Sequence, residues 1–145
     1  FDLFGPLYND IYWNECKNLI KKMPVNIKVR YRGSIENSAI NFLLNQYHFL
    51  LMPTLGENFG HSVFESLRSG CPVIISNQTP WKNLEVKKIG WDIPLENKEK
   101  FKKVVEHGVA MEQEEYQCWS KNAHDYAIKI ANNLEIIEQN RRLFL

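Results

Sequence analysis

Two acidic side chains, Glu57 and Glu65, stand eight residues apart in the segment PTLGENFGHSVFESL, residues 53–67. Two carboxylates in one segment suggest an acid/base pair, two contacts to one ligand, or ordinary helix surface. In a continuous helix they would lie about 12 Å apart along the axis, whereas glycosidase pairs that flank one bond stand roughly 5 to 9.5 Å apart. The spacing therefore argues against an acid/base pair and suits opposite ends of an extended ligand.

His61 lies midway between the two glutamates, so in a helix the three polar side chains would form one stripe, at positions i, i+4 and i+8. Val63, Phe64 and Leu67 would then face the core. The alternative is that the stripe is a solvated face, with the charge of Glu57 favouring the positive end of the helix dipole. The spacing alone leaves both interpretations open.

The glycines of this segment, Gly56 and Gly60, allow the backbone to approach a ligand closely. We expect a helix to begin near Phe59 or Gly60 and to present unsatisfied N–H groups, which suit a phosphate. No Gly-Lys-Ser/Thr follows, so the segment is not a P-loop, and it lacks the Gly-x-Gly-x-x-Gly dinucleotide fingerprint.

The rest of the chain alternates between strand-like and helix-like segments. The expected strands are residues 2–5, 27–31, 49–52, 72–76 and 91–93. The expected helices are residues 8–23, 35–46, a short piece at 82–86, 97–111 with Asn97 as its cap, 114–132 and 134–143. This alternation predicts an α/β fold, a doubly wound, Rossmann-like parallel sheet in which ligands bind beyond the carboxyl ends of the strands.

Composition excludes several classes of protein. The 145 residues suit one domain, and a net charge of +1 gives no field that points to a nucleic acid. The three cysteines lack Cys-x-x-Cys spacing, which argues against a disulfide framework or a zinc site and for a reducing compartment. The apolar run at 49–52 is too short to span a bilayer. Because the chain begins without Met, in what looks like a strand, we expect a fragment.

With its flanks, the segment resembles the E-x(7)-E motif of the GT-B retaining glycosyltransferases, especially glycosyltransferase family 4. Pro53 and Thr54 precede Glu57, a glycine follows Asn-Phe, and SGCPVIIS follows at 69–76. The resemblance covers nearly the whole chain as the C-terminal, donor-binding half. Residues 1–145 would form one nucleotide-sugar-binding domain with C-terminal helices over about 97–143. The N-terminal acceptor domain and this domain's first strand would be missing.

The resemblance implies a role for each motif residue. Glu57, the expected catalytic residue, would lie near the transferred sugar and bond its hydroxyls. Glu65 would accept hydrogen bonds from the ribose hydroxyls, because a carboxylate suits a vicinal diol. The backbone N–H groups of Asn58, Phe59 and Gly60 would face the sugar and the diphosphate. His61 would contact the donor near its phosphates. Main-chain groups of Gly33, Ser34 and Ile35 would border the base.

By the same resemblance, the full-length protein would be a hexosyltransferase of bacterial-type surface polysaccharide synthesis. It would pass a hexose from a nucleotide diphosphate sugar, most commonly a UDP-sugar, to a saccharide or lipid-linked acceptor, using neither metal nor cofactor. We expect it in the cytoplasm, at the inner face of the membrane by peripheral association, and we expect the isolated fragment to be inactive. Two alternatives stay open: a non-catalytic nucleotide- or sugar-binding module acting with a separate subunit, and a GT-B sugar-nucleotide epimerase.

The chain departs from the family pattern after the strand at 72–76. A loop that often contains Gly-Gly reads Gln78-Thr79-Pro80-Trp81 here. Trp81 either stacks on a ligand or packs under the loop, and we favour packing. The basic pair that clamps the diphosphate in the family would precede the start of this chain. Three further histidines, His48, His107 and His124, are expected to be structural.

Overall fold

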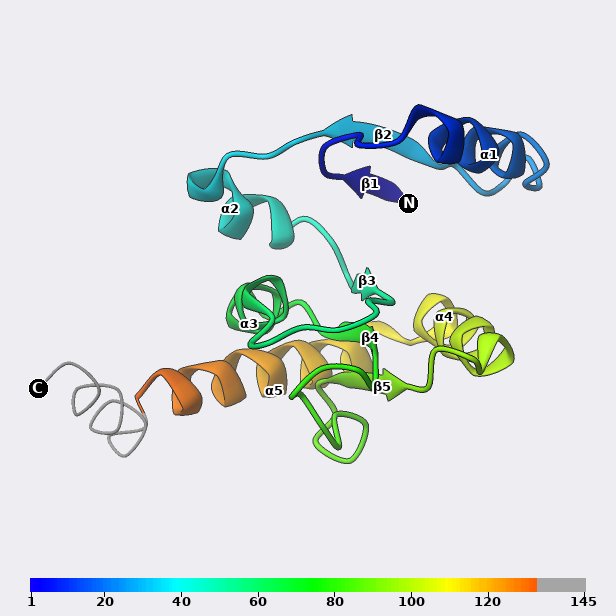
Figure 1. Ribbon diagram of the computed structural model, residues 1–145. Helices are drawn as coiled ribbons and strands as arrows, with labels where there is room; N and C mark the ends of the chain where they lie inside the picture. Colours follow the sequence, from blue (N-terminus) through cyan, green and yellow to red (C-terminus); the bar gives the residue numbers. More distant parts are fainter. Residues whose placement is uncertain (133–145) are drawn as a thin grey trace, which may run out of the picture. The chain divides into compact units, whose positions relative to one another are not determined.

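The computed structural model describes residues 1–132, so the helix predicted at 134–143 lies outside the described residues. The chain divides into two compact units, Phe1–Ile40 and the part from Asn41 onward. Each unit is described by itself below, with the elements labelled as in Figure 1.

The first unit is a small parallel β-α-β arrangement. Strand β1 (Asp2–Phe4) pairs in parallel with β2 (Arg30–Gly33), and helix α1 (Asp10–Ile20) connects them. The side chain of Asn9 accepts a hydrogen bond from the Tyr12 N–H and so begins α1 two residues later than predicted. The strand predicted at 27–31 begins only at Arg30, because the Ile27 N–H is used in a turn, where it donates to the Pro24 carbonyl at 2.9 Å.

Two arginines hold the paired strands together on one side. Arg30 Nε lies 2.7 Å from Asp2 Oδ1, and Arg32 Nε lies 3.1 Å from Asp2 Oδ2. Tyr31, between them in sequence, contacts Trp13 of α1 at 5.1 Å between ring centroids. Alternation along β2 therefore separates a charged side from a side that carries the helix. After β2 the predicted helix 35–46 is replaced by a 3₁₀ turn, η1 (Asn37–Ala39), and a short α2 (Ile40–Leu44).

The second unit contains a three-stranded parallel sheet in the order β3-β4-β5 (Figure 1). The strands are β3 (Leu50–Met52), β4 (Val73–Ser76) and β5 (Gly90–Ile93). The helices are α3 (His61–Arg68) between the first two strands, and α4 (Lys98–Ala110) and α5 (Gln113–Ala131) after the third. The prediction of an α/β fold with parallel strands is confirmed.

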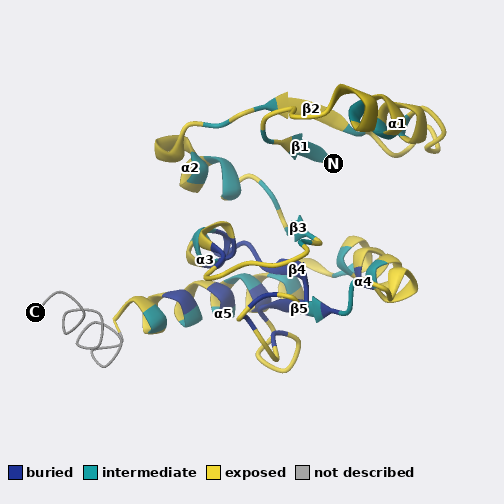
Figure 2. Ribbon diagram, viewed as in Figure 1, coloured by how far each residue is buried: buried dark blue, intermediate teal, exposed yellow. Residues whose placement is uncertain are grey.

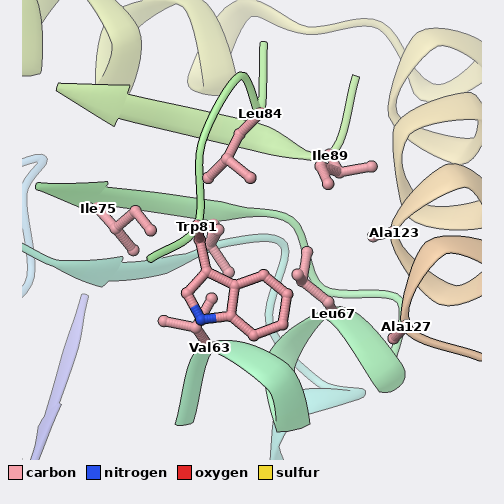
Figure 3. Packing of buried hydrophobic residues seen from close by; sticks show 9 residues of the cluster. Val63, Leu67, Ile75, Trp81, Leu84, Ile89, Ala123 and Ala127 are labelled. Atoms are coloured by element: carbon pink, nitrogen blue, oxygen red, sulfur yellow. The ribbon is translucent and has the colours of Figure 1, made fainter. Parts of the chain in front are cut away.

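Strand β4 is buried along its whole length and supplies both faces of the core (Figure 2). Val73 and Ile75 join one cluster with residues of α3 and α5, whereas Ile74 joins a second cluster with residues of α4 and the beginning of α5. This alternation is what a parallel strand covered on both sides requires. Figure 3 shows the first cluster, in which the indole of Trp81 lies against Val63.

Two helix predictions after β4 had different outcomes. The side chain of Asn97 accepts a hydrogen bond from the Lys100 N–H at 2.9 Å, which confirms its prediction as the cap of α4. The helix predicted at 82–86 is wrong, because Asn83 within it takes a positive φ of 56°, and Lys88 just after it takes a positive φ of 53°. Such residues interrupt a right-handed helix, and turns replace it. None of the helices through residue 131 is both long and apolar enough to cross a membrane.

Candidate functional site

The segment that carries Glu57 leaves the carboxyl end of β3 as a loop, residues 53–60. We call it the donor loop, after the role that the resemblance implies for it. The Thr54 hydroxyl organises its tip, since it accepts a hydrogen bond from the Gly56 N–H at 3.2 Å. The same hydroxyl has two acceptors within reach, the Gly56 carbonyl at 3.0 Å and a Glu57 carboxylate oxygen at 3.4 Å. Thr54 therefore orients both the backbone and the first glutamate.

A second loop, residues 77–81 after β4, supports the donor loop from the neighbouring strand. Ser76, at the end of β4, donates to the Thr54 carbonyl at 2.5 Å. The Glu57 N–H donates to the Gln78 carbonyl at 3.2 Å. Because β3 and β4 are adjacent and parallel, their carboxyl ends bring the two loops to the same edge of the sheet.

Gly60 ends the donor loop and is the N-cap of α3. Its φ of 77° and ψ of 65° are left-handed, a conformation that favours glycine. The Gly60 carbonyl accepts hydrogen bonds from the N–H groups of Val63 at 3.0 Å and Phe64 at 3.1 Å. Within residues 1–132, the N–H groups of Asn58, Phe59 and Gly60 donate no hydrogen bond. Free donors beside the positive end of a helix dipole suit an anion.

Helix α3 begins at His61, which confirms the predicted start near Phe59 or Gly60. The stripe of three polar side chains that a continuous helix would form therefore does not include Glu57. Glu57 lies in the donor loop, because the left-handed turn at Gly60 delays the helix until His61. The distance of about 12 Å assumed a continuous helix and does not apply. His61 and Glu65 keep their relation at i and i+4, about 6 Å apart along the axis. Neither glutamate forms an ion pair within the described part of the chain.

The exposure of these side chains differs. Glu57, Asn58 and His61 are exposed, whereas Glu65 is half-buried on α3. Phe59 is 42% exposed and has a ring contact with His61 at 5.1 Å between centroids. The structure thus brings the six predicted residues from Glu57 to Glu65 together in the donor loop and the first turns of α3.

The other three predicted residues, Gly33, Ser34 and Ile35, belong to the first unit. Gly33 ends β2 with a φ of 77°, and its carbonyl accepts a hydrogen bond from the Gly5 N–H at 3.0 Å. Ser34 is exposed and Ile35 half-buried in the loop that follows. Their contact with a base stays a prediction.

The residues SGC that follow α3 have a structural task. Gly70, with a φ of 68°, donates its N–H to Leu67, and Cys71 donates its N–H to Ser66, both at 2.9 Å. These two bonds form a Schellman motif, which ends a helix. The Ser66 hydroxyl also donates to the Cys71 carbonyl at 2.8 Å, and burial raises the pKa of the Cys71 thiol to about 11. This part of the motif therefore turns the chain into β4.

Trp81 packs in the core, as predicted, and each of the three other histidines has a contact within the second unit. Trp81 is only 6% exposed and lies in the core. His48 contacts Tyr116 edge to face. His107 lies 3.7 Å from a Glu115 carboxylate oxygen, and His124 Nδ1 lies 2.7 Å from the Arg68 carbonyl oxygen.

Metal-ligating residue types do not gather anywhere in residues 1–132: no three His, Cys, Asp or Glu side chains lie so that they could hold an ion.

Sequence reasoning missed two residues that shape the donor loop, Thr54 as an orienting hydroxyl and Ser76 as a brace. A hydroxyl residue at the end of each neighbouring strand was the available signal, because such side chains bond readily to nearby backbone groups.

In a comparison with protein-family models, residues 12–126 match the model described as "Glycosyl transferases group 1". The match spans well over half of the chain and includes the donor loop, α3, β4 and the loop 77–81. A search of curated proteins found no match.

Proposed function

The chain belongs to the glycosyl transferases group 1 family, and we propose that it is the donor-binding half of a retaining glycosyltransferase. Its fold is the Rossmann-like C-terminal domain of the GT-B fold, and membership implies a nucleotide-sugar donor. The observation that carries the proposal is the family match across the donor loop and α3. In the full-length protein, the reaction would pass a hexose from a UDP-sugar to a saccharide or lipid-linked acceptor in bacterial-type surface polysaccharide synthesis.

The beginning of α3 is suited to the donor's diphosphate. Free N–H groups at Asn58, Phe59 and Gly60 stand beside the positive end of the α3 dipole. Negative charge grows on the diphosphate as the glycosidic bond breaks, and donors that are already oriented stabilise that charge without reorganising. We place the diphosphate against these groups for that reason, with His61 beside it.

The two glutamates would hold the two ends of the donor. Glu65 is half-buried and has no ion-pair partner in the described chain, so its carboxylate is available to accept from both hydroxyls of a ribose. Glu57 is exposed and oriented by Thr54, which suits hydrogen bonds to the hydroxyls of the transferred sugar. For the first unit, taken by itself, we keep the proposal that Gly33, Ser34 and Ile35 contact the base.

Donor binding by the full-length protein tests this assignment. We expect one of UDP-, GDP- and ADP-hexose to raise the melting temperature of the wild type, UDP-hexose first. Glu65→Ala should weaken that binding by about 10- to 100-fold, because hydrogen bonds to a charged group contribute about 1.5–3 kcal/mol. Glu106→Ala removes an exposed carboxylate from α4 and serves as the control. Unchanged donor affinity in Glu65→Ala would show that the ribose assignment is wrong.

Product analysis separates the proposed reaction from its two alternatives. A transferase releases free nucleotide and leaves a glycosylated acceptor with retained anomeric configuration. An epimerase changes the sugar without an acceptor, and a non-catalytic module binds the donor without turnover. Nucleotide release that requires an added acceptor, measured together with the acceptor's gain of one hexose, is the expected result.

A further inference from the structure

The indole of Trp81 contacts the donor loop from the core of the second unit. Trp81 Nε1 donates a hydrogen bond to the Phe59 carbonyl at 2.5 Å, across 22 residues of sequence. The two rings also contact each other, with centroids 5.6 Å apart and an edge-to-face angle of 62°. Trp81 thus binds the carbonyl of the peptide unit that links Phe59 to Gly60, the N-cap of α3.

Trp81 is itself held firmly. Its ring lies in the core cluster beside Val63 (Figure 3). The Thr79 hydroxyl accepts a hydrogen bond from the Trp81 N–H at 3.2 Å and lies 3.4 Å from the Trp81 carbonyl oxygen. The indole therefore forms a fixed support for the donor loop.

Holding the Phe59 carbonyl also fixes the direction of the Gly60 N–H. The two groups belong to one planar peptide unit, and in a trans peptide they point in opposite directions. No cis peptide bond occurs in the described chain. Because the carbonyl points to the indole, the N–H points away from it, on the side of the loop where we place the diphosphate. A side chain larger than hydrogen would crowd the indole at position 60, since a Cβ there would lie 3.2 Å from Trp81 Nε1.

We propose that Trp81 is a positioning residue for donor binding: its N–H holds the Phe59–Gly60 peptide so that the Gly60 N–H faces the diphosphate of a nucleotide sugar. The inference rests on the proposed function. It assigns to Trp81 a task separate from its packing in the core, namely the orientation of one peptide. Removal of the indole N–H should therefore weaken donor binding more than a comparable loss in the core does.

The experiment compares two tryptophan variants of the full-length protein. Trp81→Phe keeps an aromatic ring but removes the N–H, and Trp91→Phe makes the same change at a residue that is 3% exposed in the other core cluster. We expect both to lower the melting temperature. Only Trp81→Phe should raise the Kd and the KM for the UDP-hexose donor, by about three- to tenfold, the range of one neutral hydrogen bond. The KM for the acceptor should not change.

A replacement that preserves the ring protects the test against misfolding. Benzothienylalanine at position 81 has nearly the shape of tryptophan but carries sulfur in place of the N–H, and we expect the same loss of donor affinity with little change in melting temperature. Equal donor Kd in this variant and the wild type would overturn the inference alone. An equal rise in the donor Kd of Trp91→Phe would also overturn it. A wild type that binds no nucleotide sugar would overturn the proposed function and the inference with it.

Discussion

Replacing Gly60 by alanine tests the geometry at the start of α3. With φ at 77° and ψ at 65°, the residue is left-handed, which costs an L-residue with a Cβ about 1–2 kcal/mol. The new Cβ would also lie 3.2 Å from Trp81 Nε1 and 3.4 Å from Val63 Cγ2, and neither neighbour is free to move within the core. Together these effects should lower the free energy of unfolding by about 2–3 kcal/mol, at the upper end of ordinary point mutations.

Thermal denaturation followed by circular dichroism measures this effect. For a chain of this size we expect the melting temperature to fall by about 6–10 °C. Gly56→Ala is the matched control in the same loop, because a Cβ there meets only the Gln78 carbonyl oxygen, at 4.0 Å. That variant should stay within about 0.5 kcal/mol of the wild type. Equal melting temperatures for the two variants would refute the left-handed assignment of Gly60 and the close packing beneath it.

Two other predictions concern the core around β4. Gly90→Ala should abolish folding, because a Cβ at this position would lie 2.1 Å from the Val73 carbonyl oxygen of the paired strand. The yield of soluble protein measures the loss of folding. A variant as stable as the wild type would contradict the close packing of β4 and β5 at Gly90. Cys71 should resist a thiol reagent at pH 8, since its raised pKa of about 11 leaves almost no thiolate, while the exposed Cys118 reacts. Mass spectrometry after timed labelling shows which cysteine reacts, and similar rates would argue against burial of Cys71.

The sequence predicted the fold class because its strongest patterns are local. Strand β4 is a run of β-branched and apolar residues with a turn on either side, and Asn97 stands where a helix cap is needed. The predictions failed where one local bond decides the boundary. The turn at Pro24 delays β2, and positive φ angles at Asn83 and Lys88 replace a helix by turns.

The residues of the candidate site stay a prediction from the motif, and the structure describes the local shape of the segment that carries them. The motif placed Glu57 and Glu65 together, and the structure keeps them in one loop and helix. The helix start near Gly60 was predicted, and it leaves Glu57 outside the stripe that a continuous helix would form. The sequence did not predict the left-handed conformation of Gly60, which lies in tertiary contact with Trp81.

That contact explains why the loop after β4 matters here although it departs from the family pattern. This chain has the residues Gln78 to Trp81 at the place where Gly-Gly is common in the family. Both ends of this loop contact the donor loop. The Gln78 carbonyl accepts a hydrogen bond from the Glu57 N–H, and the Trp81 indole N–H donates one to the Phe59 carbonyl. These bonds join residues about twenty positions apart, so no local pattern predicts them. Because they fix peptide groups on both sides of Asn58, they limit how far the donor loop can rearrange. Because the loop is already ordered before the donor binds, less conformational entropy is lost on binding.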